Sequence, residues 1–194
     1  MAADVLTGIY AVTLAQAQLD QTYASIARSN SATGALDSGF PGAALGDVCI
    51  DNKGGQWMLV KAAENITRYS LCHITNASIV AGTYLAEMTE AADIATGPKV
   101  LGLCLNTIVA ATNPYFWLFR GPGGGLDSGV KVRSENASAG ALLFPLAGTA
   151  GAVDDAVVDE AALSGLQTLT TTTTIAAVEV YATTILTCNL TEVD

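Results

Sequence analysis

The single histidine of this chain, His73, is the first side chain whose chemistry could support catalysis. It lies in the segment Leu71-Cys72-His73-Ile74-Thr75, whose apolar character predicts a β-strand. Because neighbouring residues of a strand point to opposite faces, Cys72 and His73 cannot form a nucleophile–base pair. The chain also lacks the Gly-x-Ser-x-Gly element of a hydrolase nucleophile. We therefore predict a structural role for His73 and no catalytic residue.

The four cysteines, Cys49, Cys72, Cys104 and Cys188, are widely spaced among apolar neighbours. A zinc site needs clustered Cys and His ligands, and the chain has no Cys-x-x-Cys pair and only one histidine. Nothing in the sequence indicates that Cys49, Cys104 or Cys188 approaches His73. We expect buried, reduced thiols of a protein made in a cytosol.

A glycine-rich run, Gly121-Pro122-Gly123-Gly124-Gly125, is the only candidate for a phosphate-binding loop. It lacks both the Gly-x-Gly-x-x-Gly register of a dinucleotide-binding turn and the Gly-Lys-Ser/Thr of a P-loop. We predict that it is a flexible connector and that the protein binds no cofactor.

The best metal candidate is an acidic cluster formed by Asp154, Asp155, Asp159 and Glu160, because hard oxygen ligands suit calcium or magnesium. The cluster lacks the alternating acids and central glycine of a calcium loop. On a helix, Asp155 and Asp159 would share one polar face. We therefore interpret the cluster as a solvated helix face and predict no metal site.

The aromatic segment Tyr115-Phe116-Trp117-Leu118-Phe119 carries bulky side chains at every position. Both faces of such a strand are apolar, which favours burial on both sides. The alternative is a carbohydrate-binding platform, which would need one face exposed.

Short strands must hold these residues, because residues typical of turns recur at short intervals through most of the chain after Gly46. Asp51-Asn52-Lys53-Gly54-Gly55 predicts a hairpin turn between two of them. A helix is predicted only over Asp154–Leu166 in this part. The predicted strands are Val48–Asp51, Gln56–Lys61, Ser70–Thr75, Thr83–Met88, Val100–Ala110, Tyr115–Arg120, Gly129–Arg133, Ala141–Phe144 and one or two between Thr170 and Leu190.

The first 45 residues differ from the rest, since Val12–Ile26 has the spacing of a modest amphipathic helix and small residues follow it. We predict an N-terminal arm with a short helix over residues 1–45, the alternative being a disordered leader, and a β-rich domain over 46–194. The expected fold class is mainly β: a small antiparallel β-barrel or sandwich with an N-terminal helix or arm and at most one short helix near 154–166.

Composition limits the function classes. The chain has 194 residues, of which 51% are hydrophobic and 13% charged, and its formal net charge is −10. Eight Lys and Arg cannot supply a phosphate-neutralising surface, so we expect no nucleic-acid partner. The start Met1-Ala-Ala-Asp4 lacks a signal peptide's positive charge, and polar residues and Pro114 interrupt the uncharged stretch 100–119, so we expect no export signal and no membrane span.

The low charge also predicts that other subunits cover part of the surface. The alternative is that 22 threonines and other uncharged polar residues supply the missing polarity. Three stretches carry no charge, namely 100–119, 137–153 and 161–178. We predict that these form core or subunit contacts and that the acidic turns lie outside.

A succession of short, largely apolar stretches runs from Gly46 to Val153, and all but one of them contain a glycine. They are Gly46-Asp-Val48, Trp57-Met-Leu-Val60-Lys-Ala-Ala-Glu-Asn-Ile-Thr67, Ala81-Gly82-Thr-Tyr-Leu85, Val100-Leu-Gly102-Leu-Cys-Leu, Phe116-Trp-Leu-Phe-Arg120-Gly-Pro122, Ala139-Gly140-Ala-Leu-Leu-Phe144 and Thr149-Ala-Gly-Ala-Val153. In this succession the chain resembles the small β-rich capsid decoration and head-fibre proteins of tailed bacteriophages.

The resemblance implies a virion protein, made in the bacterial cytoplasm, that sits on the outer capsid surface as an oligomer, most simply a homotrimer. Its implied partners are the major capsid protein and further copies of itself. The alternatives are a carbohydrate-binding tail or surface module and, less favoured, a small hydrolase. A major shell subunit is disfavoured because the long helix of the usual tailed-phage shell fold is not visible in the sequence.

Overall fold

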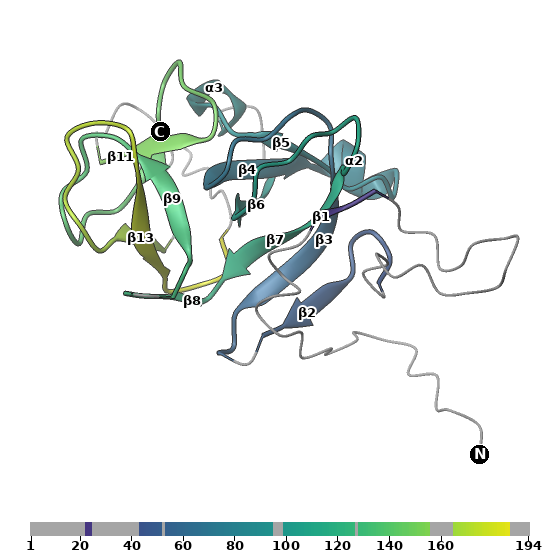
Figure 1. Ribbon diagram of the computed structural model, residues 1–194, viewed down its shortest axis with the longest axis horizontal. Coiled ribbons are helices and arrows are strands. Elements are labelled where there is room, and N and C mark those ends of the chain that lie inside the picture. The colour runs from purple at the N-terminus through teal and green to yellow at the C-terminus, as the bar shows by residue number, and fades with distance from the viewer. Residues whose placement is uncertain are drawn as a thin grey trace, which may run out of the picture.

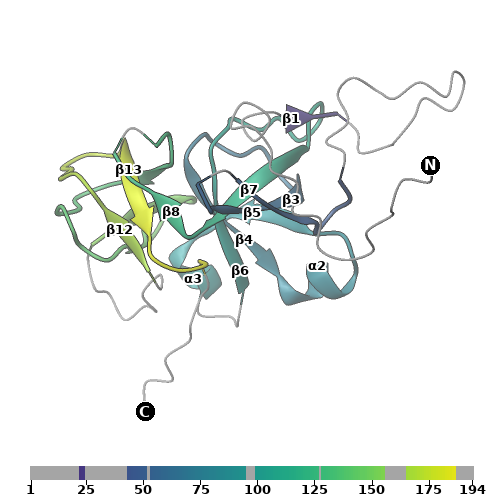
Figure 2. The same ribbon diagram turned by 90° about the horizontal axis from the view of Figure 1, so that it is seen from below.

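The computed structural model describes residues 22–24, 43–51, 53–94, 99–126, 128–155 and 165–186. The protein is mainly β, with 44% strand and 7% helix, and contains a closed five-stranded β-barrel. Figures 1 and 2 show this barrel beside a second sheet, formed by the strands from β8 onward. The predicted fold class is thereby confirmed.

The barrel closes through one parallel pairing. Around the ring the order is β3, β7, β6, β4, β5 and again β3, and only β3 and β5 run parallel. Two short strands extend this sheet, β1 beside β7 and β2 beside β3. The bounds are β1 Thr22–Tyr23, β2 Val48–Ile50, β3 Gln56–Ala62, β4 Ser70–Thr75, β5 Leu85–Met88, β6 Lys99–Cys104 and β7 Tyr115–Gly121.

Alternating side chains of the barrel strands build two separate cores. One set includes residues from all five strands and fills the barrel: Met58, Val60, Cys72, Ile74, Ala86, Cys104, Phe116 and Leu118. The other set points outward from four of these strands: Trp57, Leu59, Leu71, Leu101, Leu103, Trp117 and Phe119. The outward set is buried because the second sheet covers it.

The second sheet has the order β10, β11, β9, β13, β12, with β8 paired to β13. Its inner side chains join the outward barrel residues in one core: Val132, Val153, Leu166, Val178, Val180 and Ala182. Backbone hydrogen bonds also join the barrel to the second part of the chain; Leu71 N, for example, donates to Gly151 O (2.9 Å). The bounds are β8 Gly123–Gly124, β9 Lys131–Ser134, β10 Phe144–Pro145, β11 Ala152–Asp154, β12 Leu166–Thr168 and β13 Ala176–Ala182.

The predicted hairpin turn is confirmed between β2 and β3, and Asp51 holds it. The Asp51 carboxylate is buried and accepts hydrogen bonds from Lys53 N (2.8 Å), Gly55 N (2.9 Å) and the Trp57 indole Nε1 (2.9 Å). A carboxylate that caps its own turn in this way is common chemistry for Asp in loops.

Two short helices depart from the expectation of at most one near 154–166. They are α2 (Asn76–Val80) and α3 (Ala91–Ile94). The Thr75 hydroxyl accepts a hydrogen bond from Ser78 N (3.2 Å) and so caps the N-terminus of α2. The range 154–166 begins in β11 and ends in β12, and residues 156–164 lie outside the described part. Neither described helix has the length and hydrophobicity to cross a membrane.

The predicted helix Val12–Ile26 is wrong at the two residues of it that form a described element. Thr22 and Tyr23 are strand β1, paired with Phe116 and Tyr115 of β7. Tyr23 is only 6% exposed, so burial of an aromatic ring outweighs a weak helical period. The rest of this predicted helix, apart from Ala24, lies outside the described residues, and the 1–45 and 46–194 division stays a prediction.

Candidate functional site

Three cationic side chains from distant parts of the sequence meet on one surface of the molecule. Lys131 and Arg133 lie on β9, where they alternate with buried Val132 and Ser134 and therefore point away from the core. Arg68 is exposed in the turn that leads into β4. The pairing of β9 with β13 and the course of the chain before β4 thus place all three near the junction of the two sheets.

The contact between Tyr69 and β9 joins these elements. Arg133 N donates to Tyr69 O (2.8 Å), while the Arg68 guanidinium lies 4.5 Å from the centre of the Tyr69 ring. Arg68 Nε donates to Leu105 O (3.0 Å), and Arg133 Nη1 donates to Ala150 O (3.3 Å). Both guanidinium groups are therefore held in place. We call Arg68, Tyr69, Lys131 and Arg133 the basic surface.

The backbone at Tyr69 is left-handed, with φ 65°. For a residue other than glycine, this backbone conformation raises the conformational free energy by roughly 1–2 kcal/mol. The surrounding bonds hold this conformation, because Tyr69 N donates to Cys104 O (2.7 Å) and its carbonyl receives Arg133 N. A strained residue inside a charged surface is a feature that often marks a functional site.

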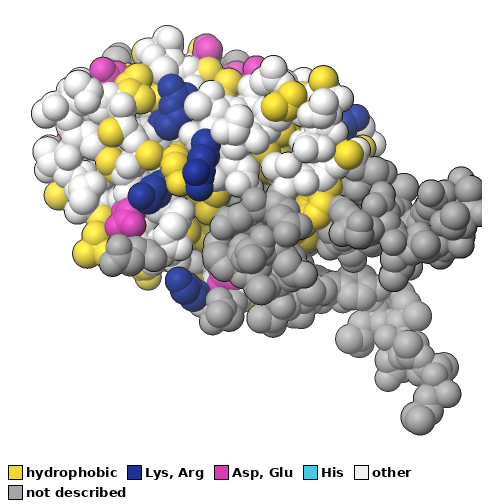
Figure 3. All heavy atoms as spheres, in the orientation of Figure 1, with side chains coloured by type: hydrophobic (Ala, Val, Ile, Leu, Met, Phe, Trp, Pro, Cys, Tyr) yellow, Lys and Arg dark blue, Asp and Glu magenta, His cyan; other side chains and the backbone are white. Residues whose placement is uncertain are grey.

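Among the described residues, no carboxylate oxygen lies within 4.0 Å of a side-chain nitrogen of Arg68, Lys131 or Arg133, and the ion-pair contacts all involve His73. Glu179 is the cross-strand partner of Lys131. Figure 3 shows Lys and Arg side chains gathered near the middle of one face, with hydrophobic side chains between them; one acidic side chain lies directly beside this group, and others lie toward the rim. The formal net charge of the whole chain is −10.

Exposed apolar side chains lie on the outer face of the second sheet, on the same face as Lys131. Tyr181 of β13 and Leu142 both lie opposite Gln167 of β12, and their exposed fractions are 42% and 44%. Tyr181 is also two residues along the strand from Glu179, whose Cα partner is Lys131. The basic surface is therefore bordered by an amphipathic sheet face.

His73 is buried beneath two carboxylates. Its side chain is 2% exposed, with Nε2 3.9 Å from Glu87 Oε2 and Nδ1 3.8 Å from Asp93 Oδ2. Glu87 is its cross-strand neighbour on β5 and Asp93 lies on α3. The Cys72 side chain points into the barrel instead, which confirms that these two adjacent residues face apart. His73 thus joins α3 to the barrel wall.

The thiols of three predicted buried cysteines are free and buried, as expected. Burial raises the pKa of Cys49 to about 12, and burial also raises the pKa of Cys72 well above its ordinary value. Thiols with such pKa values are protonated at neutral pH and are poor nucleophiles. Cys104 is buried in the barrel core, while Cys188 lies outside the described residues.

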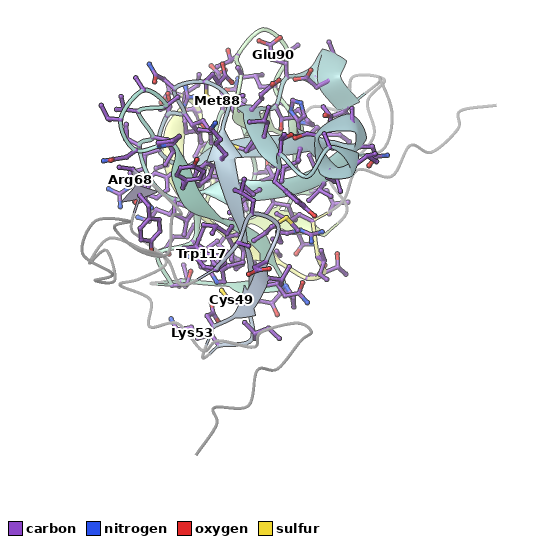
Figure 4. The ribbon with its side chains drawn as sticks, turned by 90° about the vertical axis from the view of Figure 1, so that its right-hand side faces the viewer. Cys49, Lys53, Arg68, Met88, Glu90 and Trp117 are labelled. Atoms are coloured by element: carbon purple, nitrogen blue, oxygen red, sulfur yellow. The ribbon has the colours of Figure 1, made fainter. Side chains whose placement is uncertain are left out.

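The aromatic strand β7 is buried on both faces, as predicted. Phe116, Trp117, Leu118 and Phe119 are each at most 2% exposed, and only Tyr115 is partly open. Figure 4 shows Trp117 within the body of the molecule. The exposed face that a carbohydrate platform would need is not present on this strand.

The remaining candidates have structural positions. Gly123 and Gly124 pair with β13 as strand β8, so the predicted flexible connector is instead an ordered one. A Cβ on Gly124 would lie 2.3 Å from Val180 O, which explains why glycine is required there. Among the described residues no group of three His, Cys, Asp or Glu side chains could hold a metal ion. Asp154 is the last residue of β11 and Asp155 follows it, whereas Asp159 and Glu160 lie outside the described part.

Comparison with protein-family models, with curated proteins and with solved structures gives no match.

Sequence reasoning missed the basic surface. The composition indicated that no basic stripe exists, yet the fold gathers half of the six cations whose side chains are described: Arg68, Lys131 and Arg133, as against Lys53, Lys61 and Arg120. One signal was available, because Lys131 and Arg133 alternate with apolar or small residues on a predicted strand. The position of Arg68 depends on the pairing between distant segments.

Proposed function

We propose that this protein is a structural, non-enzymatic component of a tailed-bacteriophage virion that decorates and cements the outer capsid surface. It bridges neighbouring capsomers as an oligomer, most simply a homotrimer. The resemblance that suggests this role extends over residues 46–153. That range includes the barrel and β9, and therefore the whole basic surface.

The observation that carries the proposal is the basic surface on an otherwise acidic chain. Oriented charges on a rigid sheet give a protein surface both specificity and a fast encounter with a partner of opposite charge. Arg68 and Arg133 are held by backbone carbonyls rather than by carboxylates, so their charge remains available to a partner. A docking module fits these features better than a catalyst does, because the buried thiols and His73 are held in structural positions.

Binding of a decoration protein stabilises a capsid shell because binding and assembly are thermodynamically coupled. A protein that binds the assembled lattice more tightly than the free subunit shifts the equilibrium toward the assembled state. An oligomer that touches several capsomers at once converts weak single contacts into strong overall binding. Sparse surface charge is consistent with such contacts, because interface cores are depleted in charged residues.

The test is binding to expanded capsids that lack the decoration protein. Purified protein should be an oligomer by light scattering, should co-sediment with these capsids and should raise their melting temperature. The substitution R68E is expected to weaken co-sedimentation, whereas K53E, at a lysine that Figure 4 shows on another part of the molecule, is a control with the same charge change. A monomer without affinity for capsids would contradict the proposed function.

A further inference from the structure

The second sheet closes into a ring that repeats the topology of the barrel. Residues 140–143 lead into β10 and bond to β12, since Leu143 N donates to Leu166 O (3.2 Å) and Gly140 N donates to Thr168 O (2.8 Å). The ring therefore runs through β9, β13, β12, residues 140–145, β11 and back to β9, and β9 and β11 are its parallel pair. In the barrel, β3, β7, β6, β4 and β5 follow one another in the same order, with β3 and β5 parallel.

The two rings also share one register of strand pairing. We match Val60 of β3 with Val132 of β9 and follow the pairings from strand to strand. The matched residues on the way are Phe116 and Val178, Leu118 and Val180, Cys104 and Thr168, Leu103 and Gln167, Leu71 and Leu142, Ile74 and Pro145, and Ala86 and Val153. Both paths return to their first strand at the same place, which is Ala62 in the barrel and Ser134 in the second sheet. Equal strand order and equal stagger define the same closed barrel.

Backbone conformation agrees at matched positions. The register matches Tyr69 with Gly140 and Tyr84 with Gly151, and φ is positive at all four residues, at 65°, 81°, 44° and 75°. A left-handed backbone is uncommon at tyrosine and ordinary at glycine. The same bend therefore recurs in both rings although the residue differs. The chain thus contains one barrel fold twice, first from β3 to β7 and then from β9 to β13.

Strand β1 has no described counterpart in the second of these barrels. It pairs with Tyr115 and Phe116 of β7, beyond the residues of β7 that pair with β6. The residue matched with Tyr115 is Ala177 of β13, which is exposed, and among the described residues no strand pairs with it on the side of β12. The second barrel closes in the same register without such a strand. Strand β1 is therefore an extended segment bound to the edge of a finished barrel, and we call Tyr115–Phe116 the acceptor edge.

The acceptor edge has the features of a binding site for an extended segment. Ala62 N of β3 donates to Pro114 O (2.7 Å). Because consecutive residues of an antiparallel strand direct their N–H and C=O groups to opposite sides, those of Tyr115 face β1. The side chain of Tyr23 is 6% exposed and belongs to the same core cluster as Trp117. Main-chain pairing combined with one buried aromatic side chain is a common way to bind a segment at a sheet edge.

We propose that the acceptor edge of one copy binds Thr22–Tyr23 of a second copy, so that exchanged strands hold the oligomer together. The inference deepens the proposed function, on which it rests for the presence of several copies, by naming the contact between them. Exchange replaces each contact of β1 by the identical contact in a neighbour, which is why domain swapping is a low-cost route to oligomers.

The length of chain beside β1 permits this exchange. The 18 residues 25–42 lie between Ala24 and Ala43. A chain of that length spans up to roughly 60 Å when extended. The choice between its own edge and a neighbour's edge then depends on effective concentration, because the contacts are the same. Copies held side by side on a repeating shell raise the concentration of neighbouring edges, so the proposed setting favours exchange.

The first experiment traps β1 at the acceptor edge with a disulfide. Ala24 and Pro114 are the next pair in register after Tyr23 and Tyr115, and neither is buried. A24C and P114C on separate full-length chains, coexpressed and oxidised, should give a disulfide-linked dimer, because facing positions on neighbouring strands are within reach of a disulfide. Mass spectrometry identifies this link, which can form only between copies. A24C coexpressed with L126C, at an exposed position after β8, is the control and should not give a link between the two introduced thiols.

The second experiment measures what Tyr23 contributes to association. Tyr23→Asp removes the aromatic anchor and places a charge at a buried position, so it should weaken self-association about tenfold or more in sedimentation velocity. Tyr181→Asp makes the same change at a tyrosine of the second sheet that is 42% exposed. This control should alter association less than about threefold. If Tyr23→Asp does not fold by circular dichroism, the A24C and P114C chains decide alone, because they keep Tyr23.

Each remaining outcome overturns the proposal or the proposed function. The exchange is overturned if A24C/P114C forms its disulfide only within single chains, if the mixed chains give no disulfide in solution or on capsids, or if folded Tyr23→Asp associates like the parent. A disulfide from P114C to a capsid protein instead of to A24C would identify a capsid segment as the occupant and would also overturn it. Chains that keep β1 on their own edge and still co-sediment with capsids contradict the exchange alone. A strand-exchanged oligomer that does not bind capsids contradicts the decorating role alone.

Discussion

At the scale of single residues, alternation along strands decides which groups can react. His73 and Cys72 are adjacent but face apart, and the sequence predicted this because any strand separates neighbours in this way. The partners of His73 could not be predicted in the same manner. Glu87 meets it through the register of β4 and β5, and Asp93 through a short helix whose position depends on tertiary packing.

The raised pKa of Cys49 gives a prediction about pH. A thiol whose pKa is 9.0 when unfolded and about 12 when folded loses a proton more easily in the unfolded chain. Its contribution to stability is therefore complete below pH 9 and is lost as the pH rises toward 12. We expect the free energy of unfolding to fall by about 1.4 kcal/mol for each pH unit between these values, measured by urea titration at several pH values.

Cys49→Ala is the matched control for this effect. The variant lacks the titrating group, so its unfolding free energy should decline less steeply above pH 9 than that of the parent. Equal slopes in the two proteins would contradict the assignment of the effect to Cys49. Cys72 also has a raised pKa and remains in both proteins, so the comparison isolates one thiol.

At the scale of elements, the sequence predicted strands well where both the hydrophobic pattern and the turn chemistry agreed. Segment 70–75 is strand β4 with the expected bounds, and Asp51 closes the expected hairpin. The prediction failed where a local pattern was overruled. Tertiary packing made Thr22–Tyr23 a strand, and capping by Thr75 made Asn76–Val80 a helix.

The closure of the barrel depends on Gly102 in β6. A Cβ at this position would lie 2.5 Å from Leu118 Cγ and 2.7 Å from the Phe119 carbonyl oxygen on the neighbouring strand. We expect Gly102→Ala to lower the free energy of unfolding by about 1–3 kcal/mol, because an added carbon in a packed core displaces its neighbours. Chemical denaturation of the purified variant measures this loss.

Leu118→Ala tests the physical cause. Removing the Leu118 side chain relieves one of the two close approaches, so the double variant Gly102→Ala/Leu118→Ala should be more stable than the sum of the single losses predicts, by about 0.5 kcal/mol or more. Strict additivity would show that Gly102 matters for a reason other than the space beside Leu118.

At the scale of the whole molecule, one core joins the barrel to the second sheet. Trp57, Trp117 and Phe119 point outward from the barrel into the same cluster as Val132 and Val180 of the second sheet. The sequence predicted that β7 is buried on both faces, but it could not show which elements cover each face. That arrangement follows from the closure of β3 on β5 and from the pairing of β8 with β13.

The shared core predicts that both parts unfold together. Both tryptophans of the chain, Trp57 and Trp117, lie in barrel strands and point into the core shared with the second sheet, so tryptophan fluorescence reports on that shared core. Val180→Ala removes two buried methyl groups from the second sheet and should lower the free energy of unfolding by about 2 kcal/mol. If the two parts are one cooperative unit, the urea midpoint followed by fluorescence shifts by the same amount as that followed by far-ultraviolet circular dichroism.

Val109→Ala is the matched substitution outside the core, since this side chain is 47% exposed and should change the midpoint little. A circular dichroism curve that becomes biphasic in Val180→Ala would show that the barrel unfolds independently of the second sheet. Coincident shifts instead mean that the second sheet, which carries Lys131 and Arg133, holds them at a fixed orientation to Arg68 across the shared core. A partner then meets the basic surface as one rigid arrangement of charge, so it loses less entropy on binding than it would against three independent side chains.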